Sequence, residues 1–506
     1  MTSPRPAAVV VLAAGEGTRM RSATPKVLHT LAGRSMLAHA LTAARGLEPE
    51  RVVVVVRHRR DLVVEHLRQV DPEAIVADQD DVPGTGRAVQ VALTALDERG
   101  GEVHGAVVVM AGDVPLLDAG TLGELLAAHV ADGNAVTILT TEVADPTGYG
   151  RVVRAADGGV VAIVEQKDAD DEQRAIREIN TSTYVFDADV LRGALGRVGR
   201  DNAAGEVYLT DVVAHAHADG LRVRALLADD PVTVEGVNDR VQLAALAAEM
   251  NRRILTEWMT AGVTVVDPAT TWVDVDVELA QDVTLLPGVQ LHGATVVAEG
   301  ATIGPDTTLT DVEVGPGAVV VRTHGTLAVI GPKANVGPFS YLRPGTVLGA
   351  DGKIGAFVET KNSTIGTGSK VPHLSYIGDA QIGEHTNVGA ASVTANYDGT
   401  AKNRTVIGSH VRIGVDTMLV APVSVGDGAY TGAGTVVRHD VPPGALVFSE
   451  NDQRTVEGWV ISHHPGSSAA VAAERAAASA RAEAPPGGFL APDEPDEPHD
   501  PKDDAR

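Results

Sequence analysis

The stretch IGSHVRIGVDTMLVAPVSV, residues 407–425, carries an aliphatic residue at every sixth position. The spacing continues to Val437, with Thr431 as its one break. An earlier run with the same spacing contains Ile330, Val336, Leu342, Leu348 and Ile354. Six residues are too few for a helical repeat or a propeller blade, but they match one flat face of a parallel β-helix with three hexapeptides per coil. We therefore predict a coil over residues 263–459, with these aliphatic side chains pointing inward.

The residues before the repeats alternate between strand and helix patterns. Continuous apolar runs at 7–12, 52–56 and 106–110 are typical of strands that are buried on both faces of a largely parallel sheet. Helical patterns at 36–45 and 85–96 lie between them. The sequence thus predicts a Rossmann-like α/β domain with a mostly parallel sheet over residues 1–232.

Two further segments complete the predicted organisation. Residues 233–262 form a linker with one long helix at 238–261, which Gly262 is placed to end. Residues 460–506 are rich in Ala, Pro, Asp and Glu, with few large apolar side chains, and we expect this acidic tail to be disordered.

Composition limits the classes of function. The formal net charge is −26, which argues against nucleic acid and against an anionic membrane surface as partners. The chain has no cysteine, so disulfides and cysteine-based metal or catalytic sites are excluded. The apolar run at the N-terminus is too short to span a membrane and is predicted to be a first strand. We expect a cytoplasmic protein.

A glycine-rich turn, Gly15-Glu-Gly-Thr-Arg-Met20, follows the first predicted strand. It is neither a Walker A motif nor the dinucleotide fingerprint, but glycines let backbone N–H groups approach phosphate oxygens. An ordinary strand–helix turn is about as common, so the turn alone is weak evidence. Asp113 follows the strand at 106–110, at the edge where open α/β sheets bind ligands. One carboxylate beside phosphates is a usual way to hold Mg²⁺, although a solvated turn aspartate is the simpler alternative.

Longer motifs carry a close resemblance. The segment Leu12-Ala-Ala-Gly-Glu-Gly-Thr-Arg-Met20 with Pro25-Lys-Val-Leu28 is similar to sugar-1-phosphate nucleotidyltransferases. From about residue 8 to 459 the chain resembles the bacterial family of bifunctional N-acetylglucosamine-1-phosphate uridylyltransferases and glucosamine-1-phosphate N-acetyltransferases. Further matching segments are PTGYGR at 146–151, IVEQKD at 163–168, INT at 179–181 and EGVN at 235–238.

The resemblance implies a left-handed coil, a homotrimer and a set of site residues. In the N-terminal half Mg²⁺ is bound by Asp113 and Asn238, and the phosphates of UTP are contacted by Arg19 and Lys26. Further nucleotide or sugar contacts are implied for Leu12, Ala13, Ala14, Gly15, Gln79, Gly84, Thr85, Gly150, Glu165, Asn180 and Asn238. The small-molecule substrates implied are UTP, N-acetylglucosamine-1-phosphate, glucosamine-1-phosphate and acetyl-CoA.

In the repeat region the resemblance makes His373 the general base of acetyl transfer. Polar and aromatic residues that recur at coil spacing support a site there, because a coil that only spaces or trimerises does not need them. The implied contacts with glucosamine phosphate are Arg343, Lys361, Tyr376 and Asn387. Those with acetyl-CoA are Ala390, Asn396, Tyr397, Val415 and Ala433. Asn396 and Tyr397 fall where the six-residue spacing fails, which predicts an inserted loop.

Five positions depart from the family pattern: Arg87, Ser182, Asp239, Val415 and Glu450. Val415 stands where the family has a serine, and Glu450 where some members have an arginine for coenzyme A. Both alter the expected acetyl-CoA site, whereas the other three lie nearer the nucleotide and sugar.

Two alternatives remain at this point. The chain could be a nucleotidyltransferase with a single activity, whose coil serves assembly or regulation, or a trimeric scaffold without activity. His373 with Arg343 and Lys361 favours a second active site over a spacer, and Lys26 with Asp113 weighs against a scaffold.

Overall fold

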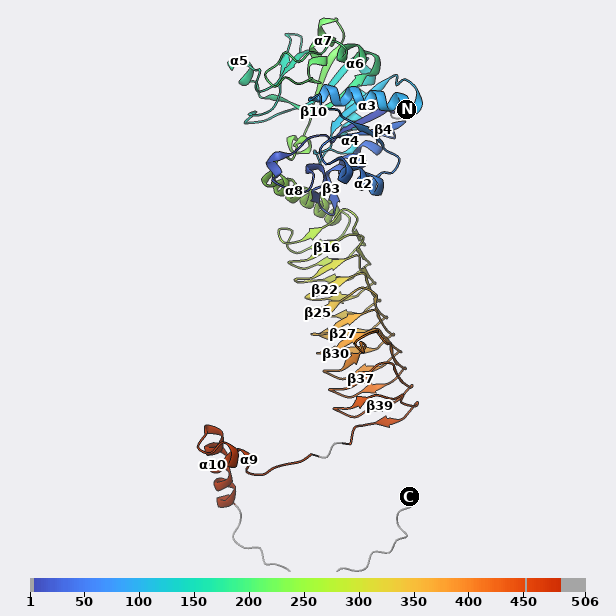
Figure 1. Ribbon diagram of the computed structural model, residues 1–506, viewed down its shortest axis with the longest axis vertical. Coiled ribbons are helices and arrows are strands. Elements are labelled where there is room, and N and C mark those ends of the chain that lie inside the picture. Colours follow the sequence, from blue (N-terminus) through green and yellow to red (C-terminus); the bar gives the residue numbers. More distant parts are fainter. Residues whose placement is uncertain (1–3, 451–452, 484–506) are drawn as a thin grey trace, which may run out of the picture. The chain divides into compact units, whose positions relative to one another are not determined.

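The computed structural model describes residues 4–450 and 453–483 (Figure 1). The chain divides into two compact units, residues 1–448 and 449–506. The first unit contains an α/β domain and a β-helix, as predicted. None of the helices in the described part of the chain combines the length and the apolar character needed to cross a bilayer.

The α/β domain is built on one mixed sheet with the strand order β11-β7-β10-β6-β1-β4-β5. Its strands are β1 (Ala8–Leu12), β4 (Arg51–Val56), β5 (Ile75–Asp78), β6 (Ala106–Ala111), β7 (Val136–Glu142), β8 (Arg151–Arg154), β9 (Val160–Val164), β10 (Glu178–Asp187) and β11 (Val223–Leu227). β6, β1, β4 and β5 are parallel, whereas β10 runs antiparallel to both β6 and β7. The predicted strands and the mostly parallel sheet are therefore confirmed.

Helices cover both faces of this sheet. Alternate residues of each central strand therefore belong to two different cores, one on each face. Val9 and Val11 of β1 belong to one core, and Ala8 and Val10 to the other. The α-helices are α1 (Met36–Arg45), α2 (Arg60–Val70), α3 (Thr85–Gly100), α4 (Ala119–Asp132), α5 (Asp171–Arg174), α6 (Ala188–Leu195) and α7 (Asp211–Ala218). Short 3-10 turns are η1 (Thr18–Met20), η2 (Lys26–Leu28) and η3 (Pro231–Val234), and a hairpin joins β2 (Thr30–Leu31) to β3 (Arg34–Ser35).

The long predicted helix is α8 (Arg240–Thr260), and it leads into the first coil of the β-helix. The side chain of Asn251 is buried and hydrogen-bonds to the backbone of that coil, as a neighbouring strand would. Nδ2 donates to Thr271 O at 2.8 Å, and Oδ1 accepts from Val273 N at 3.0 Å. These two bonds pair backbone groups at the open edge of the first coil. Another strand therefore cannot add to the β-helix at this place.

The β2–β3 hairpin of the α/β domain also contacts the first coil. Ala32 O accepts from Val275 N at 3.1 Å, and the Arg34 guanidinium forms a two-pronged ion pair with the Asp276 carboxylate. The two domains of this unit are therefore joined by the hairpin as well as by α8.

The repeat region is a left-handed β-helix with three flat faces, each a stack of parallel strands. Face 1 contains β12 (Thr264–Val265), β15 (Thr284–Leu285), β18 (Thr302–Ile303), β21 (Val319–Val320), β24 (Asn335–Val336), β27 (Lys353–Ala356), β30 (Lys370–His373), β33 (Asn387–Val388), β36 (Arg412–Ile413), β39 (Tyr430–Thr431) and β41 (Leu446–Val447). Face 2 contains β13 (Trp272–Val273), β16 (Gln290–His292), β19 (Thr308–Thr310), β22 (Thr323–Thr326), β25 (Ser340–Leu342), β28 (Glu359–Lys361), β31 (Tyr376–Gly378), β34 (Val393–Ala395), β37 (Met418–Val420) and β40 (Val436–Val437). Face 3 contains β14 (Glu278–Leu279), β17 (Val296–Val297), β20 (Glu313–Val314), β23 (Ala328–Ile330), β26 (Thr346–Leu348), β29 (Ser363–Ile365), β32 (Ala380–Ile382), β35 (Thr405–Ile407) and β38 (Val423–Val425).

The aliphatic residues of the six-residue pattern fill the interior of this coil. Ile330, Leu348 and Ile365 lie in register on successive coils of face 3, and all are buried in one continuous core. Thr431, the break in the pattern, is buried as well. Its hydroxyl accepts from Gly414 N at 2.8 Å, so a polar group is tolerated there because it has a partner.

A loop leaves the coil between β34 and β35, where the sequence predicts an insertion. A short bridge pairs Tyr397 with Lys402 and closes the loop on itself. The insertion brings Asn396 and Lys402 to the edge between faces 2 and 3.

The second unit contains α9 (Trp459–His463) and α10 (Ser468–Glu483). The structure thus differs from the predicted disorder over 460–483, and residues 484–506 lie outside the described residues. The prediction of a disordered tail rested on the lack of large apolar side chains that could form a core. It gave too little weight to alanine, which has the highest intrinsic helix propensity of all residues.

Candidate functional site

The carboxyl ends of β6, β1, β4 and β5 meet at one edge of the sheet and border two adjoining cavities. The larger, of about 820 Å³, is lined by the segment Leu12–Gly17, by Gln79 and by the Pro83–Thr85 turn. The smaller, of about 360 Å³, lies beyond β6 and is lined by Asn180, Asn238 and others. Asp113 lines both cavities, as do Ala111 and Ser182.

Four charged or amide side chains converge where the two cavities meet. The Lys26 ammonium forms an ion pair with the Asp113 carboxylate and donates to Asn238 Oδ1 at 3.1 Å. Arg19 Nη2 donates to the same Asn238 oxygen at 2.8 Å. The residues that the resemblance assigns to phosphate and metal binding are therefore in mutual contact, although more than 200 residues separate Arg19 from Asn238.

Two glycines of the larger cavity are required by the backbone. Gly17 has φ +64°, and a Cβ there would lie 2.6 Å from Lys26 Cβ. Gly84 has φ +120°, and a Cβ there would lie 2.2 Å from Val207 O. A side chain at position 17 would displace Lys26, and one at position 84 would push the turn at the start of α3 away from Val207.

The Gln79 amide is held in one orientation. Nε2 donates to Val82 O at 3.1 Å and to Gly84 O at 3.1 Å, which uses both of its hydrogens. The remaining Oε1 can only accept. The side chain thus offers an acceptor to the larger cavity, beside the Thr85 helix start.

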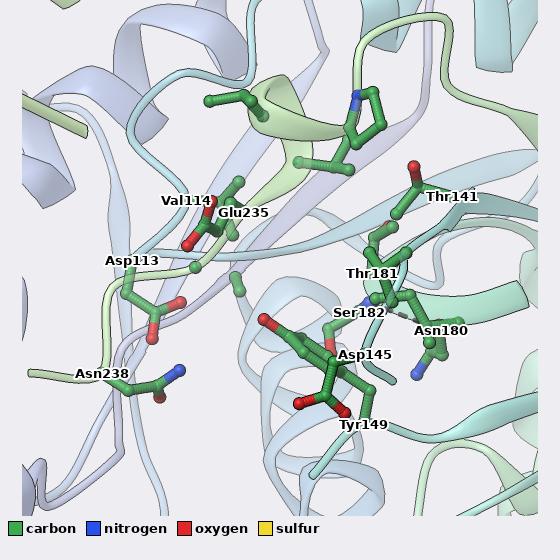
Figure 2. A pocket seen from close by; sticks show the side chains of 17 residues that line it. Asp113, Val114, Thr141, Asp145, Tyr149, Asn180, Thr181, Ser182, Glu235 and Asn238 are labelled. Atoms are coloured by element: carbon green, nitrogen blue, oxygen red, sulfur yellow. Dashed lines mark hydrogen bonds between the residues drawn. The ribbon is translucent and has the colours of Figure 1, made fainter. Parts of the chain in front are cut away.

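Figure 2 shows the smaller cavity, with Asp113 and Asn238 on one side and Asn180, Asp145 and Tyr149 on the other. Asn180 Nδ2 donates to Tyr184 Oη at 2.7 Å, which orients the amide. Gly150 and Glu165 adjoin Asn180: Gly150 O accepts from Asn180 N at 2.9 Å, and the Glu165 carboxyl lies beside Gly150. Burial raises the pKa of Glu165 above its ordinary value.

The structure also accounts for Ser182, Arg87 and Asp239. Ser182 lies in the bulge of β10 with φ +60°, a conformation that glycine adopts more readily, which explains why the family pattern has glycine there. Arg87 forms an ion pair with Asp80. Asp239 caps α8 by accepting from Val241 N and Gln242 N at 2.9 Å each, a role that asparagine fills equally well.

In the β-helix, one group of predicted residues gathers at the edge between faces 2 and 3 around Asp379. The Asp379 carboxylate accepts from Lys361 Nζ at 3.3 Å, from Asn362 Nδ2 at 2.7 Å and from Asn396 Nδ2 at 2.5 Å. Burial alone would raise the pKa of Asp379, but these hydrogen bonds lower it below its ordinary value. Tyr376 Oη lies 3.5 Å from Asn396 Nδ2.

Arg343 extends this group by one coil, where Nη1 donates to Glu359 Oε1 at 2.8 Å. Lys402 of the inserted loop contacts Lys361, and that contact lowers the pKa of Lys402. Sequence reasoning missed both Asp379 and Lys402. The signal available was an aspartate directly after Ile377-Gly378, at the coil position that Asn362 occupies one turn earlier.

A second group lies along the edge between faces 1 and 2. His373 ends β30, and its exposed ring makes no hydrogen bond within the described residues. Backbone bonds stack the following coils on it: Ala391 N donates to His373 O, Asp416 N to Ala390 O, and Gly434 N to Val415 O. Ala390, Val415 and Ala433 therefore follow His373 at one residue per coil. Asn387 lies on face 1, in register with Lys370 and Arg412.

The same edge carries an exposed ridge, made of Arg322, Phe339 and Phe357 in the preceding coils and of Leu374 beside His373. The rings of Phe339 and Phe357 stack at 5.3 Å, and the Arg322 guanidinium lies 5.9 Å from the centre of the Phe339 ring. Phe339, Phe357 and Leu374 are 54%, 60% and 59% exposed, so the ridge is an apolar surface that ends beside His373.

Comparison with known proteins agrees with both halves. A family model described as a MobA-like NTP transferase domain matches residues 9–181, and one described as bacterial transferase hexapeptide (six repeats) matches residues 404–439. The bifunctional protein GlmU of Kineococcus radiotolerans is 66% identical over 472 residues, which cover 93% of this chain and 95% of that protein. That of Pseudarthrobacter chlorophenolicus is 62% identical, with 93% and 96% covered, and that of Mycolicibacterium gilvum is 62% identical, with 92% and 94% covered. The chain therefore belongs to the GlmU family of bifunctional proteins.

Proposed function

We propose that each half of the chain carries out one transfer in the synthesis of UDP-N-acetylglucosamine, a precursor of peptidoglycan. The β-helix acetylates glucosamine-1-phosphate with acetyl-CoA. The α/β domain then transfers a uridylyl group from UTP to N-acetylglucosamine-1-phosphate and releases pyrophosphate. A chain with a nucleotidyltransferase fold, a hexapeptide acyltransferase fold and full-length bifunctional relatives is a transferase with two activities.

The assignment of uridylyl transfer to the α/β domain rests on one observation. Its polar side chains meet where the two cavities join: Lys26, Asp113, Asn238 and Arg19. A nucleotide in the larger cavity and a sugar phosphate in the smaller one can react only at this junction. The attacking phosphate is already anionic, so no side-chain nucleophile is needed. The task of the protein is to position both substrates and to neutralise charge.

The donor set at this junction fits Mg²⁺. The Asp113 carboxylate and the Asn238 amide oxygen both contact the Lys26 ammonium, so two hard oxygen donors already converge on one positive charge. Sites for Mg²⁺ commonly use one or two such oxygens and fill the remaining positions with phosphates and water. When bound, Mg²⁺ would supply charge neutralisation at the phosphoryl oxygens.

Lys26 and Arg19 are the residues of this chain that neutralise charge at the same place. Their cationic groups lie at the junction and stabilise negative charge that develops on the transferred phosphoryl group. Gly17 allows Lys26 to approach the turn, and the ordered Asn180 amide offers hydrogen bonds to the sugar.

Gln79 supports uracil as the base. Its Oε1 is an acceptor, which matches the N3–H donor of uracil and opposes the N3 acceptor of cytosine. Gln79→Ala should lower kcat/KM for UTP about tenfold, the cost of one hydrogen bond, and leave the slow reaction with CTP unchanged. Gln90→Ala is the matched control, because Gln90 bonds to Leu195 O and is not among the residues that line the larger cavity. Equal losses with UTP and CTP would exclude a role for Gln79 in base selection.

For acetyl transfer we assign His373 as the base that removes a proton from the glucosamine amine during its attack on the thioester. The cations Arg343, Lys361 and Lys402 lie in adjoining coils and offer a phosphate site, with Lys361 held by Asp379. A coil that served only as a spacer would not need this cluster, which favours two activities over one.

The two groups of acetyltransferase residues lie on opposite edges of face 2, and the apolar ridge ends beside His373. Both features support a homotrimer in which neighbouring copies complete each acetyltransferase site. Burial of the Phe339 and Phe357 rings against a second copy would explain an exposed apolar ridge on a protein with few aromatics.

Phe357→Asp should therefore weaken trimer formation by about 2–4 kcal/mol, as expected for an aromatic residue in an interface core. Acetyl transfer should fall with the trimer, while uridylyl transfer persists. The control is Leu327→Asp, equally exposed but at the edge between faces 2 and 3. Sedimentation velocity gives the oligomeric state, and an intact trimer in Phe357→Asp would remove the ridge from the interface.

Val415 is 51% exposed at the edge that follows His373, so the side chain does not fill the core. A serine hydroxyl there could bond to substrate. Val415→Ser should raise acetyl-transfer efficiency about three- to tenfold, the worth of one hydrogen bond, without change in uridylyl transfer. Steady-state kinetics of both reactions check this, and unchanged acetyl transfer would mean that the serine is dispensable in this chain.

A coupled assay tests the proposed function as a whole. The protein is supplied with glucosamine-1-phosphate, acetyl-CoA, UTP and Mg²⁺, and free thiol and pyrophosphate are read separately. We expect release of both free thiol and pyrophosphate. Pyrophosphate release should depend on the presence of acetyl-CoA. Pyrophosphate without thiol release would favour a single nucleotidyltransferase activity.

A further inference from the structure

A short cationic segment, Arg57-His-Arg59, follows β4 and lines the larger cavity. The two arginine side chains are exposed, and the ion pair that Arg57 forms with a described residue is a loose one, at 3.6 Å, with an Asp81 carboxylate that is itself fully in solvent. Both guanidinium groups are thus available to an anion in the cavity, in a protein whose net charge is −26.

The position of this segment follows from the strand order. β4 lies between β1, which leads into the Gly15–Gly17 turn, and β5, which leads into Gln79. The segment therefore lies beside the path of a nucleotide that runs from Gln79 to Asp113. Arg59 has φ +47°, an unfavourable conformation for a residue other than glycine, which costs about 1 kcal/mol or more. Such strain is common at ligand-binding positions.

The geometry of the reaction gives this segment a task. In an in-line displacement the attacking and the leaving oxygens lie on opposite sides of the α-phosphorus. The sugar phosphate approaches from the smaller cavity, so pyrophosphate departs into the larger one. Lys26 and Arg19 are already bound to Asp113 and Asn238 at the junction. Within the described part of the chain, the basic residues that line the larger cavity besides Lys26 are Arg57, His58 and Arg59, and the acidic ones besides Asp113 are Glu16 and Glu206.

We propose that Arg57, His58 and Arg59 form a subsite that binds the β- and γ-phosphates of UTP and holds pyrophosphate as it leaves. This inference rests on the proposed uridylyl transfer. In that step a bond forms between an oxygen of the sugar phosphate and the α-phosphorus. The bond from the α-phosphorus to the bridging oxygen breaks, and its electron pair leaves with pyrophosphate, the charge of which the two guanidinium groups offset.

The reverse reaction isolates this subsite, because pyrophosphate and UDP-N-acetylglucosamine are then separate substrates. The test variant is Arg57→Ala with Arg59→Gly, since glycine retains the backbone conformation at position 59. We expect the KM for pyrophosphate to rise about three- to tenfold, a modest factor because the arginines are exposed. The KM for UDP-N-acetylglucosamine should not change. The KM for pyrophosphate should also depend less on ionic strength than in the unchanged protein.

Two controls sharpen the result. Arg60→Ala removes the next arginine, which bonds to Asp78 and does not line the cavity, and should behave like the unchanged protein. Arg57→Lys with Arg59→Lys should restore most of the pyrophosphate affinity. An unchanged KM for pyrophosphate in the first variant would overturn the subsite, and so would equal rises for both substrates, which would assign the segment to the nucleoside. If the unchanged protein forms no UTP in this assay, the proposed function fails instead.

Discussion

Asp113→Ala should abolish pyrophosphate release while acetyl transfer continues at the rate of the unchanged protein. Asp113 lines both cavities and pairs with Lys26, so its loss removes the proposed metal ligand and releases the cation that it positions. Removal of one preorganised electrostatic partner commonly costs about 10²–10³-fold in kcat, and loss of the metal adds to this.

The same sample provides the control for this variant. Thiol release from acetyl-CoA reports on the β-helix, and the melting temperature reports on the fold. Asp113→Asn should restore little activity, because an amide lacks the charge that offsets Mg²⁺. If both transfers fell together in a protein that still melts normally, the two halves would not contain independent sites.

His373→Ala should slow acetyl transfer by about 10²–10⁴-fold, the usual contribution of a general base. The ring is exposed at the edge between faces 1 and 2, and the coils that carry Ala390, Val415 and Ala433 stack on its backbone. The loss is therefore expected in kcat more than in binding of the sugar phosphate, which Arg343 and Lys361 would still provide.

His385→Ala is the matched control for this prediction. His385 is also an exposed histidine of the β-helix, but it lies between faces 3 and 1 and stacks on His410. This variant should retain acetyl transfer. Full acetyl transfer by His373→Ala would assign the base to another residue.

The periodic parts of the fold could be predicted from the sequence. Each aliphatic residue of the run from Ile330 to Ile354 is buried in the β-helix core, because a hexapeptide coil turns the same position inward on every face. The central strands β1, β4 and β6 of the α/β sheet were equally visible as apolar runs. Fold and family follow from such local patterns, which require no knowledge of distant contacts.

Contacts between distant residues could not be read in this way. Asp379 joins Lys361 to Asn396 across two coils, and the latter comes from an insertion with no periodicity. The ion pair of Arg34 with Asp276 links residues 242 apart in the sequence, on two different domains. The helix α10 was missed for a different reason: local helix propensity there outweighs the absence of a core.

The central claim is that two independent sites act in sequence on one chain, and His373→Ala tests it most directly when pyrophosphate release is measured with two alternative substrates. With glucosamine-1-phosphate, acetyl-CoA, UTP and Mg²⁺, the variant should release almost no pyrophosphate. When N-acetylglucosamine-1-phosphate replaces glucosamine-1-phosphate, release should return to the rate of the unchanged protein. If the acetylated substrate fails to restore pyrophosphate release, or if release never depended on acetylation, the account of two sequential sites is contradicted.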